Sequence, residues 1–526
     1  MTPRRPWSMG FGIALAIAAC SSGHSTSSAP GGSGGSPSGG ATGNASGGST
    51  GQAGDASGNG SGGATGGVAG AATAGTAGGG TGGSSASSGG TISAAGGVGN
   101  SGGAAGGDSG GSGARGGAQG TGGSDDAGAN GGGATDGAAT GGATGAGGST
   151  STQHWVGTWT ASPYYDSANQ PPASLANSVL RQIAHVSLGG SQIRVQFSNL
   201  SGNGPVTIKS AHLALCKATP AVDSTIDTAT DEPLAFSGTA SVTIAQGKEV
   251  WSDPIDFPVP SQGNVSITIA FGSVPSNVVG HSGSRTTSYL QTDSSNVSAA
   301  SMSSATATEH WYYISGIDVM ADASAKGIVA IGDSITDGRG TDTNKNNRWT
   351  DILAARLQSN AATGNVSMMN QGIGATNLVG SSGTAAQARF DRDVLAPSGV
   401  RYAIVFDGVN DIGSGASFAS MKAAYDDLIG RAHAKGLLIY GATILPFAGN
   451  SYYTTAHESV RQQVNAYIKS GVFDGTLDFE AALTDGGNPP KLQATYATWS
   501  QMDWLHPGPA GYQKMGESVD LALFTK

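Results

Sequence analysis

The chain has 526 residues and carries 25 Lys and Arg against 35 Asp and Glu, for a net charge of -10. Basic residues form no run or patch along this mildly acidic chain, which argues against nucleic acid as a partner. The sequence also lacks the Cys and His spacing of a zinc site. His457-Glu458 begins like a His-Glu-x-x-His motif, but Arg461 occupies the last position.

The N-terminus has the features of a targeting segment. Arg4 and Arg5 precede an apolar run at residues 11–19, which is too short to span a membrane and ends at Cys20. This pattern resembles a bacterial lipobox and predicts a lipoprotein signal peptide over residues 1–20, with Cys20 as the lipidation site. An ordinary cleaved signal peptide is the alternative. We therefore expect an exported bacterial lipoprotein of the cell envelope or cell surface. The leaflet that carries the anchor is left open.

Residues 21–150 consist almost entirely of Gly, Ser, Ala and Thr, and more than half of the 90 glycines of the chain lie there. Such a segment has almost no apolar surface to bury, so we expect a disordered linker. From residue 151 the pattern changes to alternating apolar and polar residues, as in 193–197 and 265–269. Short alternating strands between turn residues predict an antiparallel β-sandwich over residues 151–325. Cys216 is expected to lie buried in one of its strands.

Residues 326–526 show a third pattern, in which apolar strands alternate with amphipathic helices. This alternation predicts an α/β domain with a central parallel sheet. Strands are expected at 328–331, 366–370, 403–406 and 437–445, and helices at 349–357, 417–435, 456–470 and 509–524.

Polar residues with catalytic chemistry follow the predicted strands of this domain. The first strand leads directly into Gly332-Asp333-Ser334, which places a serine hydroxyl at the carboxyl edge of the sheet, where open α/β folds bind ligands. A serine nucleophile needs a base, and His506 lies in a loop before the last helix. Asp503 is three residues earlier and can orient His506. Asn410, in Gly-Val-Asn-Asp after the next apolar strand, can donate to an oxyanion.

These blocks, in this order, resemble the SGNH (GDSL-type) hydrolase family, and most of all bacterial xylanase-cluster arylesterase-like members with an N-terminal β-domain. The resemblance implies a flavodoxin-like three-layer catalytic domain over residues 326–526, preceded by a jelly-roll-like sandwich. It assigns Ser334, Asp503 and His506 to catalysis. It assigns the backbone N–H of Ser334, the backbone N–H of Ala375 and the side chain of Asn410 to the oxyanion hole. The family usually has glycine at position 375. Ala375 can donate if its φ is negative, and Gly374 is the alternative.

The resemblance implies a serine esterase that needs no metal or organic cofactor. The sequence shows no long apolar lid, which favours short-chain carboxylic esters. Acetyl groups on polysaccharide, aryl esters and short-chain lipids are all compatible substrates, and the first of these is preferred. Asp337 and Arg339, one helical turn after Ser334, are interpreted as pocket residues. Two other readings remain open. The enzyme could transfer the acyl group to a sugar hydroxyl, or the β-sandwich could make the chain a carbohydrate-binding or adhesive lipoprotein. The natural ester and the oligomeric state are not determined by the sequence.

Overall fold

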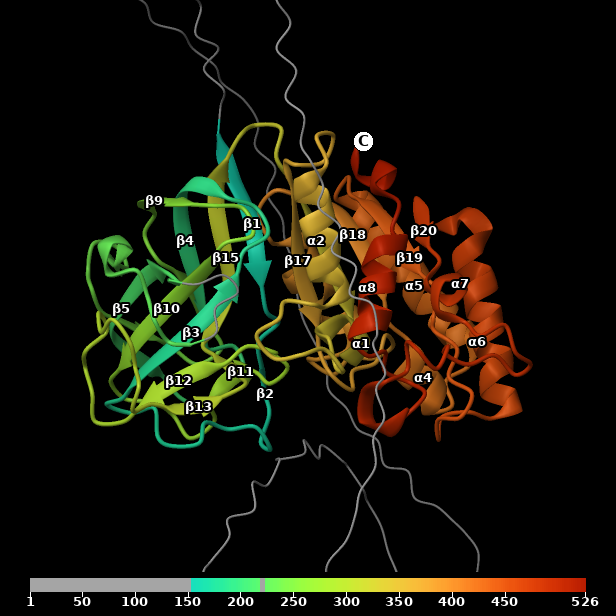
Figure 1. Cartoon of the computed structure of the whole chain (residues 1–526), viewed down its shortest axis with the longest axis horizontal. Coiled ribbons are helices and arrows are strands. Elements are labelled where there is room, and N and C mark those ends of the chain that lie inside the picture. Colours follow the sequence, from blue (N-terminus) through green and yellow to red (C-terminus); the bar gives the residue numbers. More distant parts are fainter. Residues whose placement is uncertain (1–152, 218–222) are drawn as a thin grey trace, which may run out of the picture. The chain divides into compact units, whose positions relative to one another are not determined.

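The computed structural model describes residues 153–217 and 223–526 of the chain (Figure 1). The predicted signal peptide with Cys20, and the segment predicted as a linker at 21–150, lie outside the described residues. In the part of the chain that is described, none of the helices combines the length and the apolar character that crossing a membrane requires.

The N-terminal part of the described chain is built from antiparallel strands, as the alternating pattern predicted. One sheet has the order β1-β15-β4-β8, with β9 also on β4, and a larger one has the order β13-β12-β3-β10-β5-β6, with β7 also on β5. A three-stranded sheet joins β14, β11 and β2. The strands are β1 (His154–Thr160), β2 (Tyr164–Tyr165), β3 (Val179–His185), β4 (Gly190–Ser198), β5 (Val206–Leu215), β6 (Glu232–Leu234), β7 (Val242–Ile244), β8 (Glu249–Trp251), β9 (Ile255–Val259), β10 (Asn264–Phe271), β11 (Val279–His281), β12 (Ser288–Gln291), β13 (Thr306–Thr308), β14 (Trp311–Tyr312) and β15 (Ile314–Ala321).

The two larger sheets share one hydrophobic core, as expected of a β-sandwich. Val195 of β4 and Ile317 of β15 belong to the same buried cluster as Leu213 of β5 and Ile267 of β10. Each of these four side chains is completely buried. Burial of apolar surface between the two sheets therefore holds this part of the chain together.

Two details of the β-domain differ from the sequence expectation. β10 is buried along its whole length, although its alternation predicted a half-exposed strand. The outward Thr268 is covered because its hydroxyl accepts a 2.9 Å hydrogen bond from buried Arg181, which also donates to the Ser224 carbonyl at 2.7 Å. The second difference concerns Cys216, which lies just after β5 and is only partly buried. Its prediction as a buried strand residue was wrong because β5 ends at Leu215.

The C-terminal part is an α/β domain with a five-stranded parallel sheet, which confirms the predicted fold class. Its order is β17-β16-β18-β19-β20. Figure 1 labels β17, β18, β19 and β20 of this sheet. The strands are β16 (Lys326–Gly332), β17 (Val366–Gly372), β18 (Val400–Phe406), β19 (Leu438–Ala442) and β20 (Gly475–Leu477). The helices are α1 (Ser334–Asp337), α2 (Trp349–Ser359), α3 (Ala386–Phe390), α4 (Val409–Gly413), α5 (Phe418–Ala434), α6 (Thr455–Tyr467), α7 (Phe479–Leu483) and α8 (Pro509–Ser518).

The last predicted helix, 509–524, is two elements in the structure. α8 ends at Ser518 because Val519 is extended, with φ -70° and ψ 126°. A 3-10 helix then runs over Leu521–Phe524, and the Asp520 carboxylate caps it by accepting from the Ala522 N–H.

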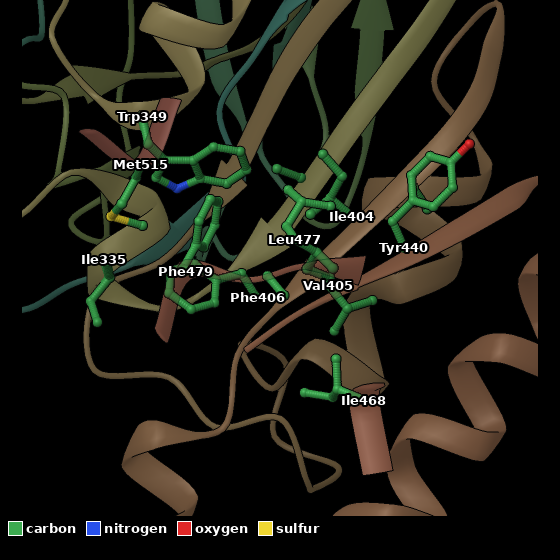
Figure 2. Close-up of a cluster of buried hydrophobic side chains, with 14 of the residues drawn as sticks. Ile335, Trp349, Ile404, Val405, Phe406, Tyr440, Ile468, Leu477, Phe479 and Met515 are labelled. Carbon is green, nitrogen blue, oxygen red and sulfur yellow. The ribbon is translucent and has the colours of Figure 1, made fainter. Parts of the chain in front are cut away.

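Helices pack around the sheet in two groups, with α2, α7 and α8 in contact with one another, and α5 in contact with α3 and α6. In the core of the first group the Trp349 and Phe479 rings meet at 5.3 Å and the Phe479 and Phe406 rings at 5.1 Å, both edge to face (Figure 2). Phe406 is the last residue of β18. This aromatic contact therefore fixes the carboxyl end of β18, where the loop to α4 begins.

A buried carboxylate joins the β-domain to the α/β domain. Asp393 accepts a 2.6 Å hydrogen bond from the Ser162 hydroxyl of the β-domain. It also accepts from the Arg389 guanidinium at 3.0 Å and from Arg392 at 2.9 Å. Asp393 and Arg389 are 2% and 1% exposed. Removing a single partner of such a network leaves an uncompensated buried charge.

We predict that Asp393→Ala lowers the free energy of unfolding by about 3–5 kcal/mol, because it leaves the buried Arg389 guanidinium without its carboxylate partner. Asp391→Ala is the matched control, because this carboxylate pairs with Arg431 at the surface, with 76% of its side chain exposed. The control should change stability by less than about 1 kcal/mol. Thermal and urea unfolding of the two variants and the parent would measure both effects. Equal losses would contradict the structural role of Asp393.

Candidate active site

Ser334 lies at the carboxyl edge of the parallel sheet, as the strand prediction required. β16 ends at Gly332, and α1 begins two residues later at Ser334. Asp333 is the N-cap of α1, since its carboxylate accepts from the Ile335 N–H at 2.8 Å. Ser334 is 5% exposed. Its own N–H donates to no protein acceptor among the described residues. An N–H at a helix start that has no protein partner is suited to bind an oxyanion.

His506 and Asp503 meet Ser334 in one hydrogen-bonded relay. The Ser334 Oγ lies 2.9 Å from His506 Nε2, and His506 Nδ1 lies 2.6 Å from Asp503 Oδ2. The other carboxylate oxygen of Asp503 accepts from the His506 N–H at 2.9 Å. The remaining histidines of this domain do not contact Ser334: His433 pairs with Asp474, and His457 with the Tyr452 carbonyl.

The surroundings of the relay favour neutral His506 and ionised Asp503. Burial lowers the pKa of His506, and the positive charges of Arg339 and Arg285 lower it further, against the opposing effect of Asp503. Burial raises the pKa of Asp503, but the hydrogen bonds that it accepts from the His506 ring and from the His506 and Leu505 N–H groups outweigh burial and hold this pKa below its ordinary value. A neutral imidazole is the form that can accept a proton from a serine.

Asn410 is held in place through both ends of its side-chain amide. Its Nδ2 donates to the Thr376 carbonyl at 2.8 Å, and its Oδ1 accepts from the Tyr452 hydroxyl at 3.1 Å. An amide nitrogen carries two hydrogens, so a second one remains available for an oxyanion. Tyr452 lies in the chain between β19 and α6, and no sequence motif identified it as part of the site.

Ala375 differs from the expectation. It has φ +60°, in the left-handed region, whereas its use as a donor was predicted to require a negative φ. For a residue with a Cβ this conformation costs about 1–2 kcal/mol. The loop imposes it, since the Ile373 N–H is fixed to the Gly332 carbonyl at 3.0 Å and the Thr376 hydroxyl to the Ile373 carbonyl at 2.8 Å. Among the described residues, neither Gly374 nor Ala375 has a protein acceptor for its N–H. The expected condition was wrong: a positive φ strains the Cβ of Ala375 but leaves its N–H in place, so both N–H groups remain candidate donors.

Buried carboxyl groups hold the loops behind the site. Asp411 accepts from the Leu378 and Val379 N–H groups at 2.7 and 3.0 Å, and so ties α4 to the loop after β17. Burial raises the pKa of Asp333 to about 7, and that of Asp407 well above the ordinary carboxyl value. Burial therefore disfavours the charged form of both acids, and a negative charge near the site would oppose an oxyanion.

Two partly exposed residues of the α/β domain, Arg339 and Trp499, form a rim beside His506, and a buried histidine of the β-domain contacts Asp337. The Trp499 ring meets the His506 ring edge to face at 5.2 Å, and the Arg339 guanidinium lies 4.8 Å from the Trp499 ring centre. The sequence analysis interpreted Asp337 as a pocket residue. In the structure its carboxylate contacts His281 of the β-domain, with Asp337 Oδ1 3.0 Å from His281 Nε2. Sequence reasoning missed Trp499 and His281 because neither belongs to a motif.

Residues 330–514 match the family model of the GDSL-like Lipase/Acylhydrolase family. No curated protein matches the chain. Solved structures give matches that each cover 38% of the chain. A protein assigned to the G-D-S-L lipolytic family from Desulfitobacterium hafniense is 23% identical, with 99% of its own chain covered and a TM-score of 0.30.

Two further solved structures are similar at the same level. A member of the lipolytic protein G-D-S-L family from Veillonella parvula is 21% identical, with 100% of its chain covered and a TM-score of 0.28. An acetylxylan esterase from Geobacillus stearothermophilus is 19% identical, with 94% covered and a TM-score of 0.30. The match of residues 330–514 to the family model confirms the resemblance expected from the motifs: the chain carries a domain of the GDSL-like lipase/acylhydrolase family.

Proposed function

We propose that the protein is a serine esterase that cleaves short-chain carboxylic esters through an acyl-enzyme on Ser334. The observation that carries this proposal is the relay Ser334–His506–Asp503, with contacts of 2.9 and 2.6 Å, inside an acylhydrolase-family domain. A serine hydroxyl becomes nucleophilic when an adjacent base accepts its proton and a third group orients that base.

The reaction follows from these contacts in two acyl-transfer steps. His506 Nε2 accepts the Ser334 proton as Oγ attacks the ester carbonyl, and Asp503 stabilises the imidazolium. The Ser334 N–H, the Asn410 amide and an N–H from Ala375 or Gly374 bind the oxyanion. His506 then protonates the leaving alcohol. In the second step it removes a proton from water, which attacks the acyl-enzyme and releases the carboxylic acid and free Ser334.

We predict that Ser334→Ala abolishes ester hydrolysis, because no other hydroxyl contacts His506 Nε2 among the described residues. The assay compares 4-nitrophenyl acetate, butyrate and octanoate, and the parent should prefer the shorter acyl chains. Loss of a triad nucleophile costs on the order of 10⁶-fold in kcat. Ser420→Ala, at the surface of α5, is the matched control and should keep full activity. Activity that survives in Ser334→Ala would contradict the proposed nucleophile.

The pKa of His506 predicts the pH dependence of the reaction. Neutral His506 is the active base, so kcat/KM should rise with pH as the imidazolium loses its proton, and then level off. Because burial and two positive charges lower this pKa, the midpoint should lie below about 6.5, the ordinary histidine value. A pH–rate profile with a neutral ester measures it. A midpoint above that value would contradict a buried, positively surrounded base.

We further propose that the protein is exported and anchored through a lipid on Cys20, with polysaccharide-bound acetyl groups as substrates. The basic and apolar signal region before Cys20 supports the anchor. The substrate proposal is supported by the polar rim of the site, where Arg339 lies against Trp499.

The anchor predicts that the protein made in a bacterial host enters the detergent phase of a Triton X-114 partition, because an acyl chain adds apolar surface. Cys20→Ala should move the protein to the aqueous phase. Mass spectrometry of the mature N-terminus is the independent measurement, and it should begin at a lipidated Cys20. A mature chain that begins elsewhere would contradict the anchor.

A further inference from the structure

Two arginines at the site differ from every other arginine that the structure describes. The side chains of Arg285 and Arg339 donate no hydrogen bond to protein, and the Nε of each is buried without a partner. All other described arginines donate to carboxylate, carbonyl or hydroxyl oxygens. Buried polar groups without partners are uncommon in folded proteins, and each needs a physical reason.

Arg339 is held at the site by its backbone. Its N–H donates to the Ser334 carbonyl at 2.8 Å, and its carbonyl accepts from the Tyr512 hydroxyl at 2.6 Å. The guanidinium lies 4.8 Å from the centre of the Trp499 ring, which in turn contacts His506. A guanidinium stacked on an aromatic ring keeps its in-plane N–H groups free to bind an oxyanion.

Arg285 comes from the β-domain, in the segment between β11 and β12. Its carbonyl accepts from the Asn344 N–H at 2.9 Å. Two residues earlier, Gly283 lies so close to the Asp337 carboxylate that a Cβ there would be 1.9 Å from Oδ2. The adjacent Ser284 carbonyl accepts from Arg348 Nη2. These contacts hold the segment against α1, and Arg285 lies close enough to His506 to lower its pKa, as Arg339 does.

Neither Arg285 nor Arg339 forms an ion pair with a carboxylate among the described residues, although Arg285 is close enough to Asp337 to help His281 lower the pKa of that carboxyl against the effect of burial. Asp337 Oδ1 pairs with His281, and Asp503 pairs with His506. The two guanidinium groups are therefore not bound directly by any carboxylate in the described part of the chain, and charged donors that are partly buried and unpaired favour an external anion.

We propose that Arg285 and Arg339 bind a carboxylate or phosphate group carried by the ester substrate, so that the preferred substrates are acyl esters of anionic molecules, such as acylated uronic-acid sugars or sugar phosphates. This inference rests on the proposed esterase function. Guanidinium groups match both anions through paired N–H donors. In this arrangement the β-domain supplies part of the substrate site.

The test uses the full-length protein and matched acetyl esters. One substrate is an acetylated methyl glucuronoside, and its partner is the same sugar with the carboxyl group as a methyl ester. An acetylated glucose 6-phosphate, paired with acetylated glucose, distinguishes phosphate from carboxylate. We expect kcat/KM for an anionic ester to exceed that of its neutral partner by about 10- to 100-fold, mainly through KM, as for charge-assisted hydrogen bonds.

Arg339→Gln and Arg285→Gln should each remove most of this preference while neutral esters remain substrates. Lysine at either position should restore part of it, because the charge is kept and the planar fork is lost. Each glutamine variant should also move the acidic limb of the pH profile to higher pH, because removing a positive charge raises the pKa of His506. Arg431→Gln is the charge-matched control, since Arg431 pairs with Asp391 and Asp427, and should change none of these values.

Calorimetric titration of Ser334→Ala with sodium glucuronate and with inorganic phosphate separates this inference from the esterase proposal. Binding of either anion that is lost in Ser334→Ala/Arg339→Gln supports the anion site even if no ester is cleaved. Ester cleavage with equal kcat/KM for anionic and neutral partners, and no anion binding, would overturn the anion site and leave the esterase proposal standing. Circular dichroism of each variant checks its fold, and Arg285→Gln serves as the test if Arg339→Gln unfolds.

Discussion

The site depends on how closely the chain approaches itself at the carboxyl edge of the parallel sheet. Gly332, the last residue of β16, pairs with Gly372 of β17 and with Phe406 of β18. A Cβ on Gly332 would lie 2.3 Å from the Phe406 carbonyl, and one on Gly372 would lie 2.2 Å from the Asp337 N–H. Only glycine permits these contacts. These close contacts place α1, and Ser334 with it, directly on the edge where the loops after β16, β17 and β18 begin.

The loops at this edge are then fixed by polar groups that sequence alone identifies only in part. Asp333 caps α1, and Asp411 binds two backbone N–H groups of the loop after β17. Burial raises the pKa of both carboxyl groups. These two acids therefore act at the site by holding loops, through hydrogen bonds that they accept from backbone N–H groups.

The β-domain contributes to the site even though its sequence pattern marks it as a separate unit. The Ser162–Asp393 hydrogen bond and the His281–Asp337 pair join it to the α/β domain at buried positions. Arg285, in the segment that follows His281, lies close enough to His506 to lower the pKa of that histidine. The β-domain therefore contacts α1 directly, and the residues around α1 come from both sides of the predicted domain boundary at residue 325.

The sequence by itself determined the antiparallel character of the first described strands, the parallel α/β class of residues 326–526 and the family of their motifs. The fold class could be predicted because the periodicity of a strand is a local property of the sequence. The site could be predicted because Asp503 and His506 are only three residues apart, and because parallel strands bring their carboxyl ends to one edge of the sheet. The sequence also predicted which side chains would meet there: Ser334 and His506 lie 2.9 Å apart. Only the tertiary structure decided the left-handed φ of Ala375, the Tyr452–Asn410 contact, the burial of β10 and the approach of Arg285. Each depends on contacts between segments distant in sequence, which no local pattern encodes.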